Sequence, residues 1–227
     1  MATILPADLA ARYDRDGFII VSDLLSPEEC DTLKAEARRL MLEKNAEGKN
    51  SVVMHMAATS PLFRALSEDA RVVDVLRPIM PEGIMFLSDK LVFKSADKTF
   101  PTPNHVDAFY WPNTRPKLSV WIPLDDATAE NGTLTVIPGS HKKKWQVAQV
   151  SDAKEFGNTI SDADCAGEEV VTCAIARGTA IVFSDLLVHG STANSSGKDR
   201  YAIISTYHAP EESFDRKFPA RKVLVTV

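Results

Sequence analysis

The sequence predicts a mainly β protein, an antiparallel sandwich or barrel with helices flanking it at the N-terminal side. From about residue 83 onward, short β-branched runs follow one another, with turn residues between them and no helical pattern. Before that point, apolar residues recur at helical spacing. The 227 residues, 44% of them hydrophobic, are therefore expected to form a single domain (1–227), helical over about 1–82 and β over about 83–227.

The helical part contains two predicted segments. Residues 26–29 (Ser-Pro-Glu-Glu) form a capping box with proline at the first helical position, which marks the start of a helix. Apolar residues then recur at helical spacing as far as Met41, and the helix is expected to run out near 47–50. A second helical region is predicted over residues 61–79.

The β part is divided by turn signals into short runs. We expect strands at residues 84–93, 117–124, 133–137, 170–175, 179–183, 201–207 and 223–227. The region 146–167, rich in Ser, Asp and Ala, is expected to form a long loop or lid on the barrel.

Composition excludes several classes of function. The net charge of −5 offers no basic excess to neutralise phosphates, which argues against a nucleic-acid-binding protein. The three cysteines lack the C-x-x-C spacing of a zinc or redox site, so reduced thiols are expected. No secretory signal is visible, and no apolar run approaches the roughly 20 residues that cross a bilayer. We therefore expect no membrane association and a cytoplasmic location.

Two histidines and an aspartate are the candidate metal ligands. His105 and Asp107 are two positions apart, and on a strand such residues face the same side. His189 follows the predicted strand that ends at 183 and would add a second imidazole. Two imidazoles and one carboxylate on one face of an ion leave the opposite positions open, which is the arrangement of non-haem Fe(II) oxygenases.

A serine and an arginine follow His189 closely in the sequence. Ser191 is two positions after His189, and Arg200 opens a predicted strand in which Ala202 and Ile204 share its face. A guanidinium beside a hydroxyl inside a barrel suits a carboxylate held by two hydrogen bonds.

Two further histidines, His141 and His55, are not interpreted as metal ligands. His141 ends a Pro-Gly-Ser-His turn and is interpreted as a residue that stabilises the barrel end. His55 lies between Met54 and Met56, in a stretch that is a candidate border of the active site.

Three stretches of the chain resemble the phytanoyl-CoA dioxygenase family. They are residues 104–111 (NHVDAFYW), Trp121 followed by residues 131–141 (NGTLTVIPGSH), and residues 189–196 leading to Arg200. The likeness runs from about residue 12 to 207. It implies a double-stranded β-helix, that is, a jelly-roll, cupin-like barrel, and an oxygenase that depends on Fe(II), 2-oxoglutarate and O2.

The resemblance also implies roles for individual residues. The iron ligands would be His105, Asp107 and His189. The far carboxylate of 2-oxoglutarate would be held by Arg200 and Ser191. The cosubstrate pocket would be lined by Trp121, with Lys90 as a further candidate. The sequence departs from the family at Asn104 and Val106, where Trp and Gln are frequent, but neither position supplies a ligand.

The expected reaction is hydroxylation of a C–H bond in a small-molecule metabolite, giving succinate and CO2. Halogenating relatives have a small residue in place of the carboxylate, so Asp107 favours hydroxylation, with desaturation or ring formation left open. Phe109, Tyr110 and Trp111 are candidates for an apolar, aromatic substrate pocket. The acidic balance offers no cationic site for the phosphates of an acyl-CoA, so a free small molecule is expected, and no protein partner is evident.

Three alternatives remain open at this point. The first is a non-catalytic, metal-binding, cupin-like binding or sensor module, which would give Arg200 and Ser191 no role. The second is a zinc hydrolase with the same ligands; it needs a general base, and the sequence places neither Glu130 nor Asp185 at the metal. The third is a jelly-roll interaction protein that binds no metal.

Overall fold

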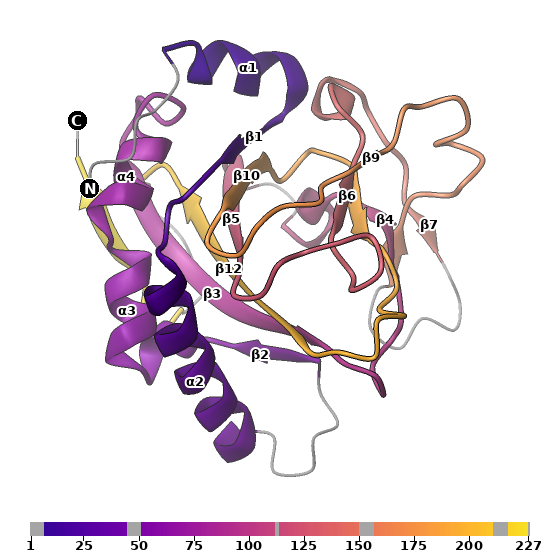
Figure 1. Ribbon diagram of the computed structural model, residues 1–227. Coiled ribbons are helices and arrows are strands. Elements are labelled where there is room, and N and C mark those ends of the chain that lie inside the picture. Colours follow the sequence, from indigo (N-terminus) through magenta and orange to yellow (C-terminus); the bar gives the residue numbers. More distant parts are fainter. Residues whose placement is uncertain (1–6, 45–50, 112–113, 150–156, 211–217, 227) are drawn as a thin grey trace.

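Two antiparallel sheets pack against each other in the computed structural model, and helices cover the outer face of the larger sheet (Figure 1). The structure describes residues 7–44, 51–111, 114–149, 157–210 and 218–226. The larger sheet has the strand order β1-β10-β5-β12-β3-β13, with β2 also paired to β3. Its strands are β1 (Phe18–Val21), β2 (Val52–Met54), β3 (Ile84–Lys94), β5 (Lys117–Pro123), β10 (Ala180–Ser184), β12 (Arg200–His208) and β13 (Lys222–Val225).

The smaller sheet carries both candidate histidine ligands, His105 on β4 and His189 on β11. Its order is β4-β11-β6-β9. The strands are β4 (Thr102–His105), β6 (Leu134–Val136), β9 (Val171–Thr172) and β11 (His189–Ser191). A separate pair is formed by β7 (Ala148–Gln149) and β8 (Asn158–Thr159), and the 3-10 turns are η1 (Met56–Ala58), η2 (Asp107–Tyr110) and η3 (Ser140–Lys142).

The helices are α1 (Leu9–Asp16), α2 (Pro27–Lys44), α3 (Pro61–Ser67) and α4 (Ala70–Leu76). The predicted capping box is present at α2, because Ser26 N donates to a carboxylate oxygen of Glu29 at 2.7 Å and Glu29 N donates to Ser26 Oγ at 3.3 Å. The second predicted helical region is split in two, since the Asp69 side chain accepts from Arg71 N at 2.8 Å and caps a new helix.

The larger sheet separates two hydrophobic clusters. The outer cluster joins Phe63 and Leu76 of the helices to Phe86 and Ile203 of the sheet. The inner cluster lies between the sheets and includes Trp121, Phe183 and Val136. Such burial stabilises each sheet face by roughly 25 cal/mol per Å² of apolar surface.

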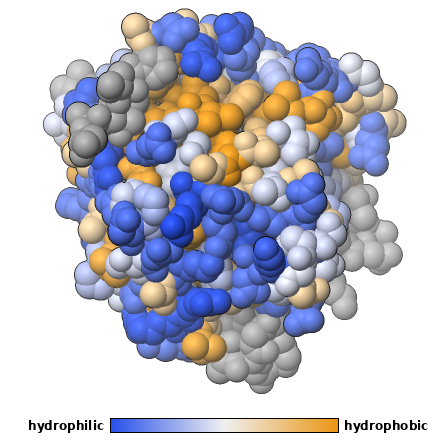
Figure 2. Space-filling view, in the orientation of Figure 1, coloured by the Kyte–Doolittle hydropathy of each residue, from blue (hydrophilic) through white to orange (hydrophobic). Residues whose placement is uncertain are grey.

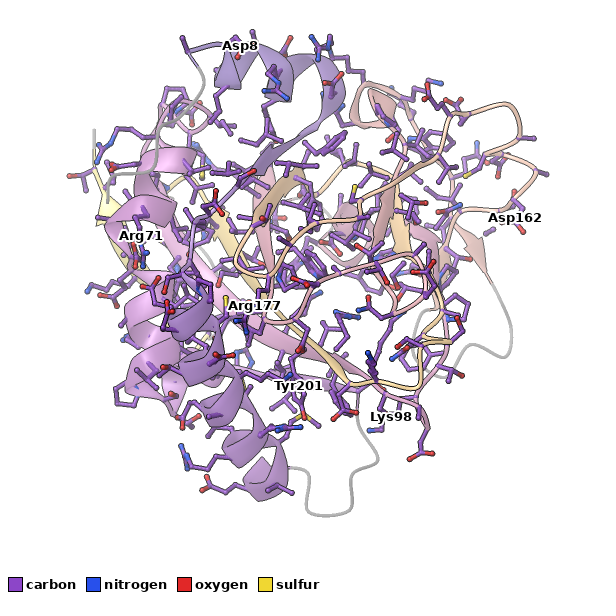
Figure 3. All side chains as sticks on the ribbon, in the orientation of Figure 1. Asp8, Arg71, Lys98, Asp162, Arg177 and Tyr201 are labelled. Carbon is purple, nitrogen blue, oxygen red and sulfur yellow. The ribbon has the colours of Figure 1, made fainter. Side chains whose placement is uncertain are left out.

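Side chains alternate across β12, and this alternation directs the functional residues inward. Tyr201, labelled in Figure 3, points toward α2, where Arg38 Nε donates to its hydroxyl at 3.4 Å. Ala202 and Ile204 belong to the inner cluster, as the shared face of this strand predicts. Arg200 is two positions before Ala202, so its side chain is on the same face of β12 and points into the space between the sheets.

The structure differs from the expected division of the chain in the N-terminal third. β1 pairs with β10, and β2 pairs with β3, so residues before 83 also contribute to the barrel. All seven predicted strand regions contain a strand, although in 170–175 the strand β9 has only two residues and Ile175 forms a separate bridge with Ala127. Within the predicted loop 146–167, residues 150–156 lie outside the described part, and the remainder contains β7 and β8.

The visible face in Figure 2 is largely hydrophilic, with apolar side chains gathered below α1. Among the described residues, no helix combines the length and apolar character that a membrane span requires.

Candidate metal centre

His105, Asp107 and His189 converge at the inner side of the smaller sheet. His105 ends β4, His189 begins β11, and the two are partners across the antiparallel pair. Their Nε2 atoms lie 3.7 Å and 3.8 Å from the same oxygen, Asp107 Oδ1. All three ligand atoms lie within 4.8 Å of one another. Atoms bound at about 2 Å to one ion are separated by about 3–4 Å, so this spacing fits a single metal.

Local backbone geometry places the carboxylate beside the imidazoles. The predicted strand ends at His105, and Asp107 is the first residue of η2. Val106 between them is extended, with φ −118° and ψ 135°. Asp107 therefore still faces the same side as His105, as it would on a continuous strand.

Backbone carbonyls orient both rings. Nδ1 of His105 is 2.9 Å from Pro103 O, and Nδ1 of His189 is 2.9 Å from Leu187 O. With the proton of each ring on Nδ1, the Nε2 lone pair of each is directed at the common point. This is the support that metal-binding histidines receive in proteins.

The charges of the three residues suit a cation. Burial acts to raise the pKa of Asp107, but Lys90 and the two histidines outweigh it and hold the pKa below its usual range. Burial, together with the neighbouring His105, lowers the pKa of His189 to about 4. At neutral pH the site offers an ionised carboxylate and a neutral His189 imidazole, the protonation states in which these groups bind metals. Ser119 Oγ also donates to Asp107 Oδ2 at 3.3 Å.

Gly190 follows a candidate ligand because β4 and β11 approach closely there. A Cβ atom at this position would lie 2.7 Å from Thr102 O and 3.2 Å from the side-chain oxygen of Asn104. We expect Gly190→Ala to lower the free energy of unfolding by about 1–3 kcal/mol and to weaken metal binding, since β11 must move away from β4. Thermal melts with and without Fe(II) measure both effects; an unchanged melting temperature would contradict this account.

Arg200 is a buried cation with unsatisfied donors. It is 1% exposed, and Nε and Nη1 have no hydrogen-bond partner within the described part of the chain. Its guanidinium carbon lies 5.7 Å from the centre of the Trp121 ring, and burial lowers the pKa of Arg200 to about 10. A buried charge without a partner is costly, and an anionic ligand that accepts from both donors removes that cost. The residues present therefore fit the carboxylate of a 2-oxo acid.

Ser191 is prepared to donate a hydrogen bond. Its Oγ accepts from Lys94 Nζ at 2.8 Å and from Thr102 N at 3.2 Å. A hydroxyl has two acceptor positions and one proton, so with both positions used the Ser191 proton is left for an acceptor. Lys94 is also the partner of Arg200 across β3 and β12.

Lys94 is a buried residue of this site that the sequence motifs did not indicate. Its ammonium donates to Phe100 O and Thr192 O as well as to Ser191, and its side chain is 1% exposed. Burial and the neighbouring Arg200 lower the pKa of Lys94 to about 7. The sequence contained a signal for this residue: Lys94 is four positions after Lys90 on the same predicted strand, so the two side chains are expected on the same face.

A small cavity of about 40 Å³ opens beside Asp107. Most of its lining residues are charged or polar, among them Lys90, Lys117 and Asp185. Of the three expected aromatic residues, Trp111 is part of this lining. The Lys117 ammonium lies 5.2 Å from the centre of the Trp111 ring.

The other two aromatic candidates lie elsewhere. Phe109 packs against a third cluster that includes Ile137 and Val188. The Tyr110 ring stands edge-on to His105 at a centroid distance of 6.5 Å, and its side chain is partly exposed. Phe109 therefore packs in this cluster and is not among the residues that line the cavity.

The structure brings Asp185 to the cavity, where the sequence could not place it. The residue is 4% exposed, and its Oδ1 is buried with no hydrogen-bond partner among the described residues. Burial, with a contribution from Asp107, raises the pKa of Asp185 to about 6. Glu130, by contrast, is exposed in the Asn131 turn.

The two other histidines lie outside the ligand group. His141 Nε2 is 3.1 Å from Asp14 O, at the barrel end where η3 meets α1, as its interpretation as a turn residue predicts. The His55 ring stands edge-on to Phe218 at 5.9 Å, while its neighbour Met54 lines the cavity.

Known proteins resemble this chain over most of its length. Residues 13–202 match the sequence profile of the family described as phytanoyl-CoA dioxygenase (PhyH). An ectoine dioxygenase of Sphingopyxis alaskensis is 28% identical over 247 residues, covering 96% of this chain and 80% of that protein. The phytanoyl-CoA dioxygenase domain-containing protein 1 homolog of Caenorhabditis elegans is 23% identical and covers 90% of each chain.

Solved structures confirm the predicted jelly-roll fold. EctD from S. alaskensis, solved with 2-oxoglutarate and 5-hydroxyectoine, superposes with a TM-score of 0.76 at 26% identity, covering 92% of this chain and 77% of that one. The non-haem, α-ketoglutarate-dependent carbocyclase SnoK from nogalamycin biosynthesis has a TM-score of 0.77 at 21% identity, covering 89% and 84%.

Proposed function

The chain belongs to the phytanoyl-CoA dioxygenase family, and from this membership we propose that His105, Asp107 and His189 hold its iron. The protein is an Fe(II)- and 2-oxoglutarate-dependent dioxygenase. When bound, the metal and 2-oxoglutarate supply the oxidation of a C–H bond by O2, with succinate and CO2 as the other products. The observation that carries the assignment is the convergence of three ligand atoms within 4.8 Å of one another.

The ligands leave one side of the metal for the cosubstrate and substrate. Both imidazoles come from the paired strands β4 and β11, and Asp107 comes from the turn that follows β4. A metal held by these three side chains would keep its remaining positions for 2-oxoglutarate, O2 and the substrate. The carboxylate ligand is present, which favours hydroxylation over halogenation.

Arg200 and Ser191 are proposed to grip the far carboxylate of 2-oxoglutarate. Arg200 offers two buried donors, and Ser191 offers its proton because Lys94 and Thr102 occupy its acceptor positions. Lys94 has three acceptors of its own, so we assign it the role of positioning Ser191. Trp121 forms the wall against which the guanidinium lies.

The substrate is a small molecule, and we propose a free polar metabolite rather than an acyl-CoA. The cavity beside Asp107 is small and charged, which does not suit a long acyl chain. The curated relatives named above include ectoine dioxygenases, which are named for a small substrate. The three cysteines are unpaired and buried, which supports work in the reducing cytoplasm. The relatives that match over most of the chain are oxygenases, so a non-catalytic metal-binding module is not favoured.

Anaerobic titration tests the assignment directly. We expect the Fe(II)-loaded protein to develop a weak visible charge-transfer band that saturates as 2-oxoglutarate is added, because a chelated 2-oxo acid absorbs there. The same protein loaded with Zn(II) provides the blank, since zinc has no such transition. Bound iron with no band on addition of 2-oxoglutarate would contradict the proposed site.

A further inference from the structure

The cavity beside Asp107 contains two groups of opposite charge that the proposed iron and 2-oxoglutarate sites do not use. Asp185 follows β10 and Lys90 lies on β3, and both line the cavity together with Asp107. The inference below rests on the proposed function, because it assigns this cavity to the substrate of the oxygenase.

Asp185 is fixed in place, and one oxygen of its carboxylate has no hydrogen-bond partner among the described residues. Its backbone N donates to Lys117 O at 3.0 Å, and its carbonyl accepts from Ala108 N at 2.9 Å. The side chain is 4% exposed, and Oδ1 has no hydrogen-bond partner in the described part of the chain. Leaving a buried carboxylate oxygen unsatisfied costs free energy, and a bound donor removes that cost.

Lys117, whose charge acts on Asp185, donates its hydrogen bonds to other groups. Lys117 donates to Thr114 Oγ1 at 2.5 Å and to Arg115 O at 2.8 Å, and its ammonium lies over Trp111. Within the described residues, no ion pair of 4 Å or less joins Lys117 to Asp185. A cationic group of a ligand therefore has access to Asp185 without displacing an internal salt bridge.

Lys90 provides the opposite charge. It is the backbone partner of Ile204 on β12 and of Met54 on β2, it is half-buried, and its side chain makes no hydrogen bond or ion pair with any described residue. Its charge acts on Asp107, but Asp107 is committed to iron in the proposed site. An anionic group in the cavity is the partner that suits this ammonium.

We propose that Lys90 and Asp185 bind the two ends of a small zwitterionic substrate. Lys90 pairs with its carboxylate, and Asp185 pairs with its ammonium or amidinium group. Asp107 lies with both residues on the cavity wall, so a molecule held at its two ends presents the carbon skeleton between them to the metal side. A ligand without a hydrogen-bond donor at this end would leave Asp185 buried and unsatisfied, and a cationic donor satisfies it best because it also neutralises the charge.

Stability of the full chain, loaded with Fe(II) and 2-oxoglutarate without O2, tests Asp185 without knowledge of the substrate. Asp185→Asn keeps the shape and removes the unpaired charge, so we expect a higher melting temperature. Asp69→Asn is the matched control, because Asp69 caps α4 and pairs with Arg71, and its melting temperature should fall. A fall for Asp185→Asn as well would show that its carboxylate has an internal partner and would overturn the inference.

Three compounds that share a five-membered ring test the charge pattern. L-Proline carries both charges, cyclopentanecarboxylate only the negative one, and pyrrolidine only the positive one. Binding is followed through the change that each compound causes in the anaerobic charge-transfer band. We expect L-proline to bind roughly tenfold more tightly than either single-charge ring. Asp185→Asn should reduce its affinity to that of cyclopentanecarboxylate, and Lys90→Met to that of pyrrolidine.

The outcomes separate this inference from the proposed function. If 2-oxoglutarate produces no band, the proposed site fails. If the band forms but the three rings bind equally, or none binds, the zwitterion site alone is overturned. If Lys90→Met weakens 2-oxoglutarate and leaves the preference among the rings unchanged, Lys90 belongs to the cosubstrate pocket, and the inference is again overturned.

Discussion

Replacing Asp107 by Ala is expected to weaken Fe(II) binding by at least about two orders of magnitude and to abolish most 2-oxoglutarate turnover. Asp107 Oδ1 is the atom that both imidazoles face, at 3.7 and 3.8 Å. It is also the only anionic ligand of the three. Loss of a residue that merely supports a metal ligand typically costs 10–100-fold in affinity, so loss of a charged ligand should exceed this range. Iron retained after anaerobic dialysis and succinate formation measure the two effects.

An exposed aspartate provides the control for this substitution. Asp74 lies on α4 with 66% of its side chain exposed, so Asp74→Ala should retain both iron and turnover. Full iron content and unchanged succinate formation in Asp107→Ala would remove Asp107 from the ligand set. Ser119→Ala adds an intermediate case, because it removes only a hydrogen bond of 3.3 Å to the other carboxylate oxygen.

The long strands were predictable because their signal is local. β3, β5 and β12 contain runs of apolar and β-branched residues that are buried on both faces, one toward the helices and one toward the barrel interior. A continuous apolar run bounded by turn residues carries that information in a single window of sequence.

The strands that carry the candidate ligands gave no such signal. β4 contains Pro103 and polar residues, and β11 has only three residues, with Gly190 at its centre. β4 exists because it pairs with β11, and β11 pairs with β6 on its other side; both pairings join distant parts of the chain. β1 was missed as a strand for the same reason, since its partner β10 lies about 160 residues further along.

The ligand pair His105 and Asp107 could be predicted because it depends only on their spacing in the sequence. The lining of the cavity depends on how the backbone turns after β4 ends, which the sequence pattern did not indicate. A continued strand would put Phe109 and Trp111 on the face of Asp107. The 3-10 turn η2 has three residues per turn instead, which aligns Tyr110 with Asp107 and directs Phe109 into another cluster. Asp185 and Lys94 were missed because their importance comes from unpaired or shared hydrogen bonds, and sequence spacing does not encode these.

Arg200→Ala is the second substitution with a large expected effect, and it should separate cosubstrate binding from metal binding. We expect the apparent dissociation constant for 2-oxoglutarate to rise by about two orders of magnitude, because truncating one partner of a buried charge pair costs about 2–5 kcal/mol. Iron content should stay nearly unchanged, since Arg200 is not among the three grouped ligands. Anaerobic titration of the charge-transfer band measures the constant, and Ser191→Ala should give a smaller rise, of about tenfold, for one lost hydrogen bond.

Melting temperature distinguishes a binding role of Arg200 from a structural one. Because Nε and Nη1 have no partner among the described residues, removing the guanidinium relieves an uncompensated buried charge and offsets part of the cost of the lost packing on Trp121. Arg77→Ala is the control, because it removes an arginine that is exposed; it should leave 2-oxoglutarate binding unchanged. If Arg200→Ala melts far below the wild type yet binds 2-oxoglutarate equally well, the arginine is structural. A raised constant in a protein that still folds and holds iron assigns it to the cosubstrate carboxylate.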